Sequence, residues 1–122
     1  MKIGVLTSGG DAPGMNAAIR AVVRCGIDAG MEVYGIKRGF DGLLDGEIEQ
    51  MSPSSVGDIL HRGGTVLKTA RSERFSTEEG VKRAKVILGT FGIDALVVIG
   101  GDGSMRGALE LSKLGVNLMC LP

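Results

Sequence analysis

The sequence has few aromatic residues and no net charge. Its 122 residues include no Trp, one Tyr and three Phe, and 14 basic residues balance 14 acidic ones. A protein that binds nucleic acid needs a basic surface, and one that binds single strands also needs aromatic side chains on which bases stack. We therefore expect no nucleic-acid partner.

Long apolar runs are also missing, and cysteine is scarce. No segment approaches the roughly 20 apolar residues that a membrane span needs, and Met1 leads into an apolar strand without a signal-peptide pattern. We therefore expect a soluble, cytoplasmic protein with no membrane partner. No spacing pairs Cys25 with Cys120, which predicts two buried free thiols in a reducing compartment.

Glycine, in contrast, is abundant, with 21 residues. Residues 8–14 read SGGDAPG and residues 99–104 read IGGDGS, and each stretch follows a predicted strand. Glycines let backbone N–H groups approach phosphate oxygens, a helix that starts after such a loop favours negative charge, and Asp102 can hold a hard cation. Two such loops in one short chain predict phosphate chemistry.

The expected strands and helices alternate along the chain. Strands are predicted at residues 3–7, 32–36, 95–99 and 116–121, and helices at residues 15–30, 54–61, 76–91 and 104–115. Such alternation predicts an α/β fold with a mostly parallel, three-layer, doubly wound sheet. Ligands of such sheets bind beyond the carboxyl ends of the strands, where both glycine loops lie.

Local patterns give further expectations. The glycine- and acid-rich residues 39–49 predict a loop. Ser76 and Glu79 match a capping box that opens the next helix. In the last helix, Ala108 and Leu109 are expected on the apolar face, together with Met105 and Ser112.

Two common phosphate-binding motifs fit poorly. Gly9 and Gly14 have the P-loop separation, but residues 15–16 are Met-Asn instead of Lys and a hydroxyl residue, which excludes that motif. Gly101 and Gly103 match the first two glycines of a dinucleotide fingerprint, but the third, Gly107, comes one place too late. The acidic residue that the fingerprint needs near the end of the next strand is also missing. An NADP-dependent oxidoreductase that uses Arg38 remains an alternative.

Four ordered blocks of the sequence resemble bacterial-type ATP-dependent 6-phosphofructokinases. They are LTSGGDAPGMNAAIR at residues 6–20, HRGGT at 61–65, TAR at 69–71 and VVIGGDGS at 97–104. Related lipid and NAD kinases share the GGDG motif alone, whereas the four blocks together are specific. The resemblance implies that residues 1–122 are a portion of the Rossmann-like, ATP-binding N-terminal domain of such a subunit, whose remainder is absent from this chain.

The resemblance also implies an activity and a set of site residues. The family transfers the γ-phosphoryl group of MgATP to the 1-hydroxyl of fructose 6-phosphate in glycolysis, giving fructose 1,6-bisphosphate and ADP. The implied ATP-binding residues are Gly10, Phe40, Arg71, Ser72, Gly101, Asp102, Gly103 and Ser104. Asp102 would hold Mg²⁺, and Arg71 would be catalytic by stabilising the transferring phosphoryl group. Phe40 reads equally well as a core aromatic.

Gly103 bears on the phosphoryl donor. Pyrophosphate-dependent relatives carry an aspartate at the matching position, and its side chain intrudes on the nucleotide site. Glycine leaves room for ATP, so the resemblance favours the ATP-dependent branch.

The resemblance further implies an allosteric effector site for ADP or phosphoenolpyruvate. It would include Arg20, Arg24 and Asp58. Arg20 and Arg24 lie one helical turn apart and are expected to point away from the core. Relatives often supply another arginine from the segment matching residues 51–58, which here has no basic residue, so the effector response stays open.

The expected catalytic base lies beyond Pro122. In the family it is the first aspartate of a Thr-Ile-Asp-Asn-Asp stretch, and most fructose 6-phosphate contacts follow it. We therefore expect this chain to be inactive alone and the full-length subunit to form a homotetramer. A nucleotide-binding regulatory module without catalysis is the alternative function.

Overall fold

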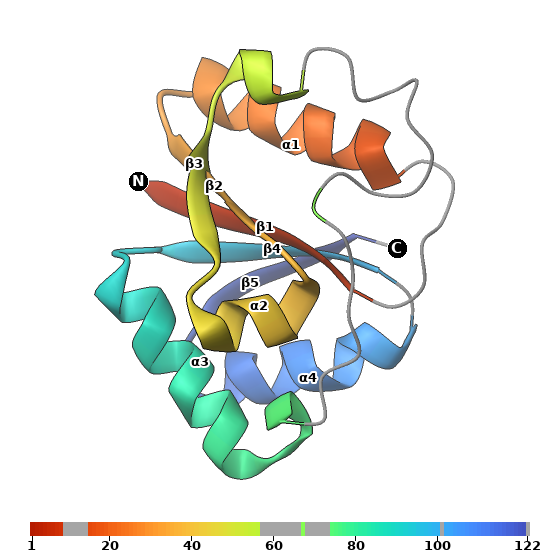
Figure 1. Cartoon of the computed structure of the whole chain (residues 1–122), viewed down its shortest axis with the longest axis vertical. Helices are drawn as coiled ribbons and strands as arrows, with labels where there is room; N and C mark the ends of the chain where they lie inside the picture. Colours follow the sequence, from red (N-terminus) through yellow and green to blue (C-terminus); the bar gives the residue numbers. More distant parts are fainter. Residues whose placement is uncertain (9–14, 57–66, 68–73, 101, 122) are drawn as a thin grey trace.

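Five strands form one sheet in the order β3-β2-β1-β4-β5. In this computed structural model, which describes residues 1–8, 15–56, 67, 74–100 and 102–121, the strands are β1 (Lys2–Ser8), β2 (Glu32–Ile36), β3 (Ile48–Met51), β4 (Ala95–Gly100) and β5 (Asn117–Leu121). Neighbouring strands are parallel except for β3, which pairs with β2 in the antiparallel sense. The predicted mostly parallel sheet is confirmed (Figure 1).

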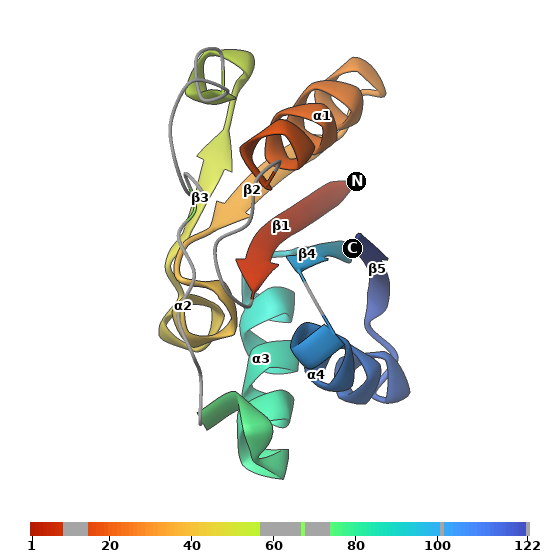
Figure 2. The same cartoon turned by 90° about the vertical axis from the view of Figure 1, so that its right-hand side faces the viewer.

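Helices cover both faces of this sheet. They are α1 (Met15–Asp28), α2 (Gly39–Asp45), α3 (Glu78–Thr90) and α4 (Asp102–Lys113), with short 3-10 turns η1 (Pro53–Val56) and η3 (Arg74–Ser76). Figure 2 shows α1 on one side of the strands and α3 and α4 on the other. The predicted three-layer arrangement is therefore confirmed.

Alternating side chains of the strands supply two separate cores. On β1, Val5 belongs to the core beneath α1, whereas Leu6 belongs to the core beneath α2, α3 and α4. On β4, Ile99 belongs to the core beneath α1, whereas Val98 belongs to the core beneath α2, α3 and α4. Because successive side chains of a strand point to opposite faces, a continuous apolar run is what a strand buried on both faces requires.

The expected loop at residues 39–49 is wrong, because this stretch contains α2 and the start of β3. Phe40, Leu43 and Leu44 are buried at the three- and four-residue spacing of a helix face. Gly46 ends the helix in the left-handed conformation (φ 73°), and its N–H donates to carbonyl oxygens of the last turn. Of the glycines and acids that suggested a loop, Gly46 ends this short helix, and Asp41 and Asp45 pair with Arg38 at its start.

The first turn of α3 also differs from the capping-box prediction. The N-cap is Thr77, whose side-chain oxygen accepts a hydrogen bond from the Gly80 N–H at 3.0 Å. Ser76 instead belongs to η3. One face of α3 is buried, since Val81, Ala84 and Leu88 are all less than 9% exposed.

Three further expectations need correction. The last helix begins at Asp102, two residues before the predicted start. Its buried face includes Ala108 and Leu111, whereas Leu109 is 56% exposed. Cys25 is exposed, and only Cys120 is partly buried.

Candidate nucleotide site

Two chain segments leave the sheet side by side at the carboxyl edge of its central strands. Ser8 ends β1 and lies in register with Gly100, which ends β4. The two glycine loops begin directly after these residues. The helices that follow, α1 and α4, both begin on the same side of the molecule, at the right of Figure 1. In the described residues, two parallel strands therefore end and two helices begin on the same side of the molecule, and the N-terminus of a helix favours an anionic ligand.

Buried polar side chains gather at the same edge. Within the described ranges, the buried polar residues are Thr7, Ser8 and Asn16, which are 0%, 9% and 5% exposed. The first two end β1, and Asn16 is in the first turn of α1. Sequence reasoning did not single these residues out. For Thr7 and Ser8, the signal that could have found them is the change from apolar to hydroxyl side chains at the end of a strand buried on both faces.

The structure describes only some of the predicted ATP-site residues. Gly10, Arg71, Ser72 and Gly101 lie outside the described residues, as does Asp58 of the predicted effector site. The backbone of Asp102, Gly103 and Ser104 forms the first turn of α4. The N–H groups of a first helical turn have no partner within their own helix, which is why helix N-termini are common anion sites.

Phe40 is a core residue in this structure. It is 6% exposed, and its ring stacks on Phe75 with a centroid separation of 4.0 Å and an interplanar angle of 5°. The Phe75 ring in turn packs against Gly107 of α4, where a Cβ atom would overlap it. A contact between Phe40 and adenosine stays a prediction.

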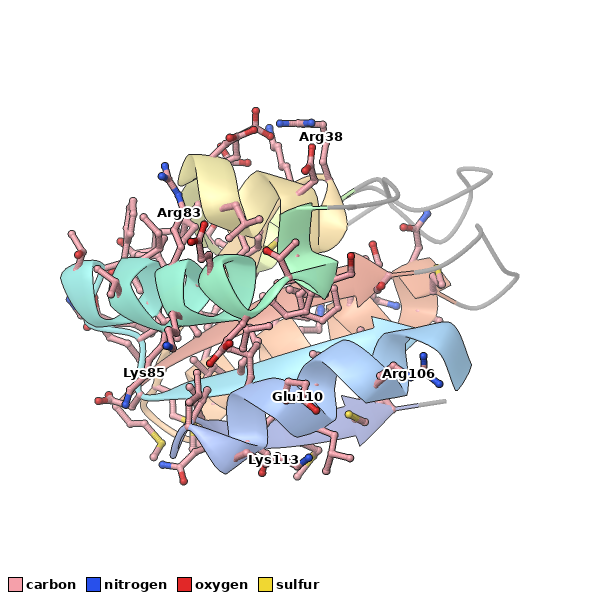
Figure 3. The ribbon with its side chains drawn as sticks, turned by 90° about the horizontal axis from the view of Figure 1, so that it is seen from below. Arg38, Arg83, Lys85, Arg106, Glu110 and Lys113 are labelled. Atoms are coloured by element: carbon pink, nitrogen blue, oxygen red, sulfur yellow. The ribbon has the colours of Figure 1, made fainter. Side chains whose placement is uncertain are left out.

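A cavity of about 330 Å³ lies between the start of α3 and the end of α4. It is lined by Ser76, Thr77, Glu78, Val81, Lys82, Glu110, Lys113 and Leu114. Its charged groups are paired along each helix, Lys82 with Glu78 at 3.4 Å and Lys113 with Glu110 at 3.3 Å. Figure 3 shows Glu110 further along α4 than Arg106, which is nearer the start of the helix.

Arg38 is held by three carboxylates at the start of α2. Its guanidinium nitrogens lie 2.8 Å from Glu47, 2.8 Å from Asp45 and 3.2 Å from Asp41. Hydrogen bonds to Glu47 and Asp45 raise the pKa of Arg38 above its ordinary value. A 2′-phosphate that approached Arg38 would meet these carboxylates, so the geometry argues against the NADP alternative.

The two arginines of the predicted effector site differ in exposure. Arg24 is exposed, as expected, whereas Arg20 is half-buried. The Nε atom of Arg20 is buried and has no hydrogen-bond partner in the part of the chain that the structure describes. Arg20 therefore does not point fully away from the protein.

No metal centre made only of protein ligands is found in the described residues. Nowhere among them do three His, Cys, Asp or Glu side chains come together as a metal site would require. Mg²⁺ bound with a nucleotide needs only one or two carboxylates, because phosphates and water supply the other ligands. Among the same residues, no helix has the length and apolar character to cross a bilayer.

The doubly wound sheet, with a glycine-rich stretch of sequence after each of its two central strands, defines the chain as an α/β protein. A sequence model of the family described as "PFK: Phosphofructokinase" matches residues 2–122. The chain belongs to the phosphofructokinase family.

Curated relatives and a solved structure agree with this assignment. The chain is 67% identical over 121 residues to the "ATP-dependent 6-phosphofructokinase" of Clostridium tetani, which covers 99% of this chain and 38% of the relative. It is 64% identical over 120 residues to the protein of the same name from Clostridium botulinum, covering 98% of the chain and 38% of that relative. Phosphofructokinase from Saccharomyces cerevisiae matches the fold with a TM-score of 0.91 and 41% identity, over 98% of this chain and 19% of that one. The chain thus spans well under half the length of these relatives.

Proposed function

We propose that this chain is the ATP-binding part of an ATP-dependent 6-phosphofructokinase. The reaction is transfer of the γ-phosphoryl group of MgATP to the 1-hydroxyl of fructose 6-phosphate, giving fructose 1,6-bisphosphate and ADP. The observation that carries the proposal is the register of Ser8 with Gly100, which starts both glycine loops at neighbouring points of the sheet edge. The similarity to ATP-dependent relatives supports ATP as the donor.

In this proposal the phosphates bind at the start of α4. The first-turn N–H groups of Asp102, Gly103 and Ser104 face the phosphates, together with the backbone at Gly10 and Gly101. Phosphoryl transfer depends mainly on positioning and charge neutralisation, and the guanidinium of Arg71 supplies charge to the transferring group. Gly103 leaves room for ATP.

The cavity between α3 and α4 suits the other end of the nucleotide. Glu110, which lines it, follows Asp102 by eight residues, or about 12 Å along a helix axis. A nucleotide with its phosphates at the start of α4 would reach this cavity with its base and ribose if it lay along the helix. Its mixed apolar and charged lining suits an adenosine group.

Asp102 is the residue that would hold Mg²⁺. Its carboxylate is a hard oxygen ligand, and its place in the first turn of α4 puts it beside the proposed phosphate site. Bound there with ATP, Mg²⁺ would neutralise charge on the β- and γ-phosphates.

The rest of the reaction depends on the longer subunit. The catalytic base and most contacts to fructose 6-phosphate are proposed to come from the part that this chain does not include, so residues 1–122 alone would bind nucleotide without turnover. The same subunit would assemble as a homotetramer in the cytoplasm. An effector site for ADP or phosphoenolpyruvate would include Arg20, Arg24 and Asp58.

Asp102→Asn tests the nucleotide site in a completed subunit, defined as residues 1–122 joined to the remaining part of the Clostridium tetani relative. We expect Asp102→Asn to weaken Mg²⁺-dependent ATP binding about 100-fold, because a charged phosphate–metal ligand is lost. Calorimetric titration with ATP, with and without Mg²⁺, measures this effect.

Asp28→Asn is the matched control. Asp28 is exposed and ends α1, at the opposite end of that helix from the site. Its substitution should leave ATP binding unchanged. Equal ATP affinity in the unmodified completed subunit and Asp102→Asn would contradict the proposed nucleotide site.

A further inference from the structure

Strand β5 lies at one edge of the sheet, and its side chains are apolar on both faces. Leu118 and Cys120 pack against the core beneath α2, α3 and α4. Met119 is in register with Val97 on the face that carries α1, and Leu121 packs against the core on that face. A strand with apolar side chains on both faces is typical of the interior of a parallel sheet. The sequence of β5 therefore suits a strand with a neighbour on each side.

The opposite edge of the same sheet has a different character. Strand β3 exposes Glu49 and Gln50, and the Glu49 carboxylate lies 3.2 Å from the Lys37 ammonium group. Charged side chains on an edge strand oppose pairing with a further strand. β5 contains no charged residue. Of the two edges, β3 therefore has the composition of an edge that faces solvent, and β5 does not.

The sheet face that carries α1 is covered unevenly. Helix α1 packs on β1, β2 and β4, and Figure 2 shows it away from β5. On this face, Ile99 is 3% exposed, whereas Val97 is half-buried and Met119 is 61% exposed. On the opposite face of β4, Leu96 and Val98 are each 1% exposed. Apolar side chains of β4 and β5 thus remain accessible on one face of a sheet whose type is normally covered on both.

The rest of the longer subunit is the occupant that fits both features. The chain covers 38% of each Clostridium relative, so more than half of the length of each relative lies outside it. That length can supply a strand beside β5 and a segment that packs on Met119. A second copy paired edge to edge through β5 would only extend the sheet sideways. It would leave Val97 and Met119 of each copy uncovered, because edge pairing adds no layer over a sheet face.

We propose that β5 is an interior strand of the longer subunit. A strand from the part that this chain does not include pairs with the outer edge of β5, and apolar side chains of the same part pack on Val97 and Met119. This inference rests on the proposed function in one respect, since both take the chain as one part of a longer subunit. It assigns no role in catalysis to the interface.

Methionine oxidation in the completed subunit tests whether Met119 is covered. Hydrogen peroxide converts accessible methionine to the sulfoxide, and peptide mass spectrometry gives the initial rate at each position. Met51, which is 7% exposed, is the buried reference. We expect Met119 to react at a rate within about twofold of Met51, and at least about tenfold more slowly than an exposed methionine.

Val86→Met is the matched control and supplies that exposed methionine. Val86 is 65% exposed on α3, close to the 61% of Met119. Methionine favours a helix at least as well as valine, so the variant should fold normally. If nothing covers β5, the methionine introduced at position 86 and Met119 should react at similar rates.

Hydrogen exchange tests the strand pairing in the same protein. In an edge strand, about half of the N–H groups point away from the sheet and exchange quickly. We expect those of residues 117–121 to exchange at least about tenfold more slowly than the outward N–H groups of β3. Equal rates at the two edges would show that no strand pairs with β5.

The outcomes separate this inference from the proposed function. Oxidation of Met119 as fast as that of the methionine at position 86 overturns the interface. Protection that disappears when the subunits are diluted until they dissociate also overturns it, because a second copy then provides the cover. Protected Met119 without formation of fructose 1,6-bisphosphate contradicts the proposed function alone, and turnover with rapid oxidation of Met119 contradicts the interface alone.

Discussion

Glycine residues in this chain serve several structural purposes that composition does not separate. Gly46 adopts a positive φ and ends α2. Gly42, inside the same helix, is required by packing, because a Cβ atom there would overlap the carbonyl oxygen of Lys37. Gly89, in contrast, has no neighbour within 4 Å of a built Cβ atom. Only the three-dimensional surroundings show which glycines can be replaced.

Gly42→Ala tests this difference at one residue. We expect it to lower the free energy of unfolding by about 3 kcal/mol or more, because the backbone of α2 must move to relieve the overlap. Gly89→Ala is the matched control and should raise the free energy by about 0.5–1 kcal/mol, since alanine favours a helix. Urea unfolding of the two variants measures both values. Similar stability in the two variants would show that the close approach at Gly42 is wrong.

Helices α2 and α3 pack together beside the proposed site. The Arg83 side chain of α3 donates a hydrogen bond of 3.1 Å to the carbonyl oxygen of Leu44 in α2, and Figure 3 shows Arg83 next to α2. The start of α2 also contacts Leu67 through the Arg38 N–H and Phe75 through the Phe40 ring. The element with the weakest sequence signal is therefore held by contacts to α3, Leu67 and Phe75.

The start of α3 gives a prediction at the scale of an element. Thr77→Ala should lower the free energy of unfolding by about 1 kcal/mol, because the Gly80 N–H loses its side-chain acceptor. Ser76→Ala should cost less than half as much, because Ser76 precedes the cap. Urea unfolding distinguishes the two. A larger loss of stability in Ser76→Ala than in Thr77→Ala would show that Ser76 is the N-cap, as the capping-box prediction has it.

At the scale of the whole molecule, the layered sheet follows from local patterns and the finer contacts do not. Apolar runs followed by glycine loops predicted β1 and β4 and the edge where their loops leave, because strands buried on both faces have a strong signal. The glycine- and acid-rich sequence of α2 concealed a seven-residue helix. The Phe40–Phe75 stack joins residues that are distant in sequence, which no local pattern specifies.

The same limit applies to the candidate site. The motif blocks predicted the family and the loops, and the family is confirmed. The surroundings of Arg38 were not predictable, because Asp45 and Glu47 reach it only through the fold of α2 and the turn that follows. The roles given to Gly10, Arg71 and Asp102 stay predictions.

Phosphoryl transfer by the completed subunit is the most direct test of the central proposal. With MgATP and fructose 6-phosphate it should form fructose 1,6-bisphosphate and ADP at about 1–100 s⁻¹, the range typical of kinases. Residues 1–122 alone should form neither product. Tight MgATP binding without fructose 6-phosphate-dependent turnover in the completed subunit would contradict the account, and would favour a nucleotide-binding module without catalysis.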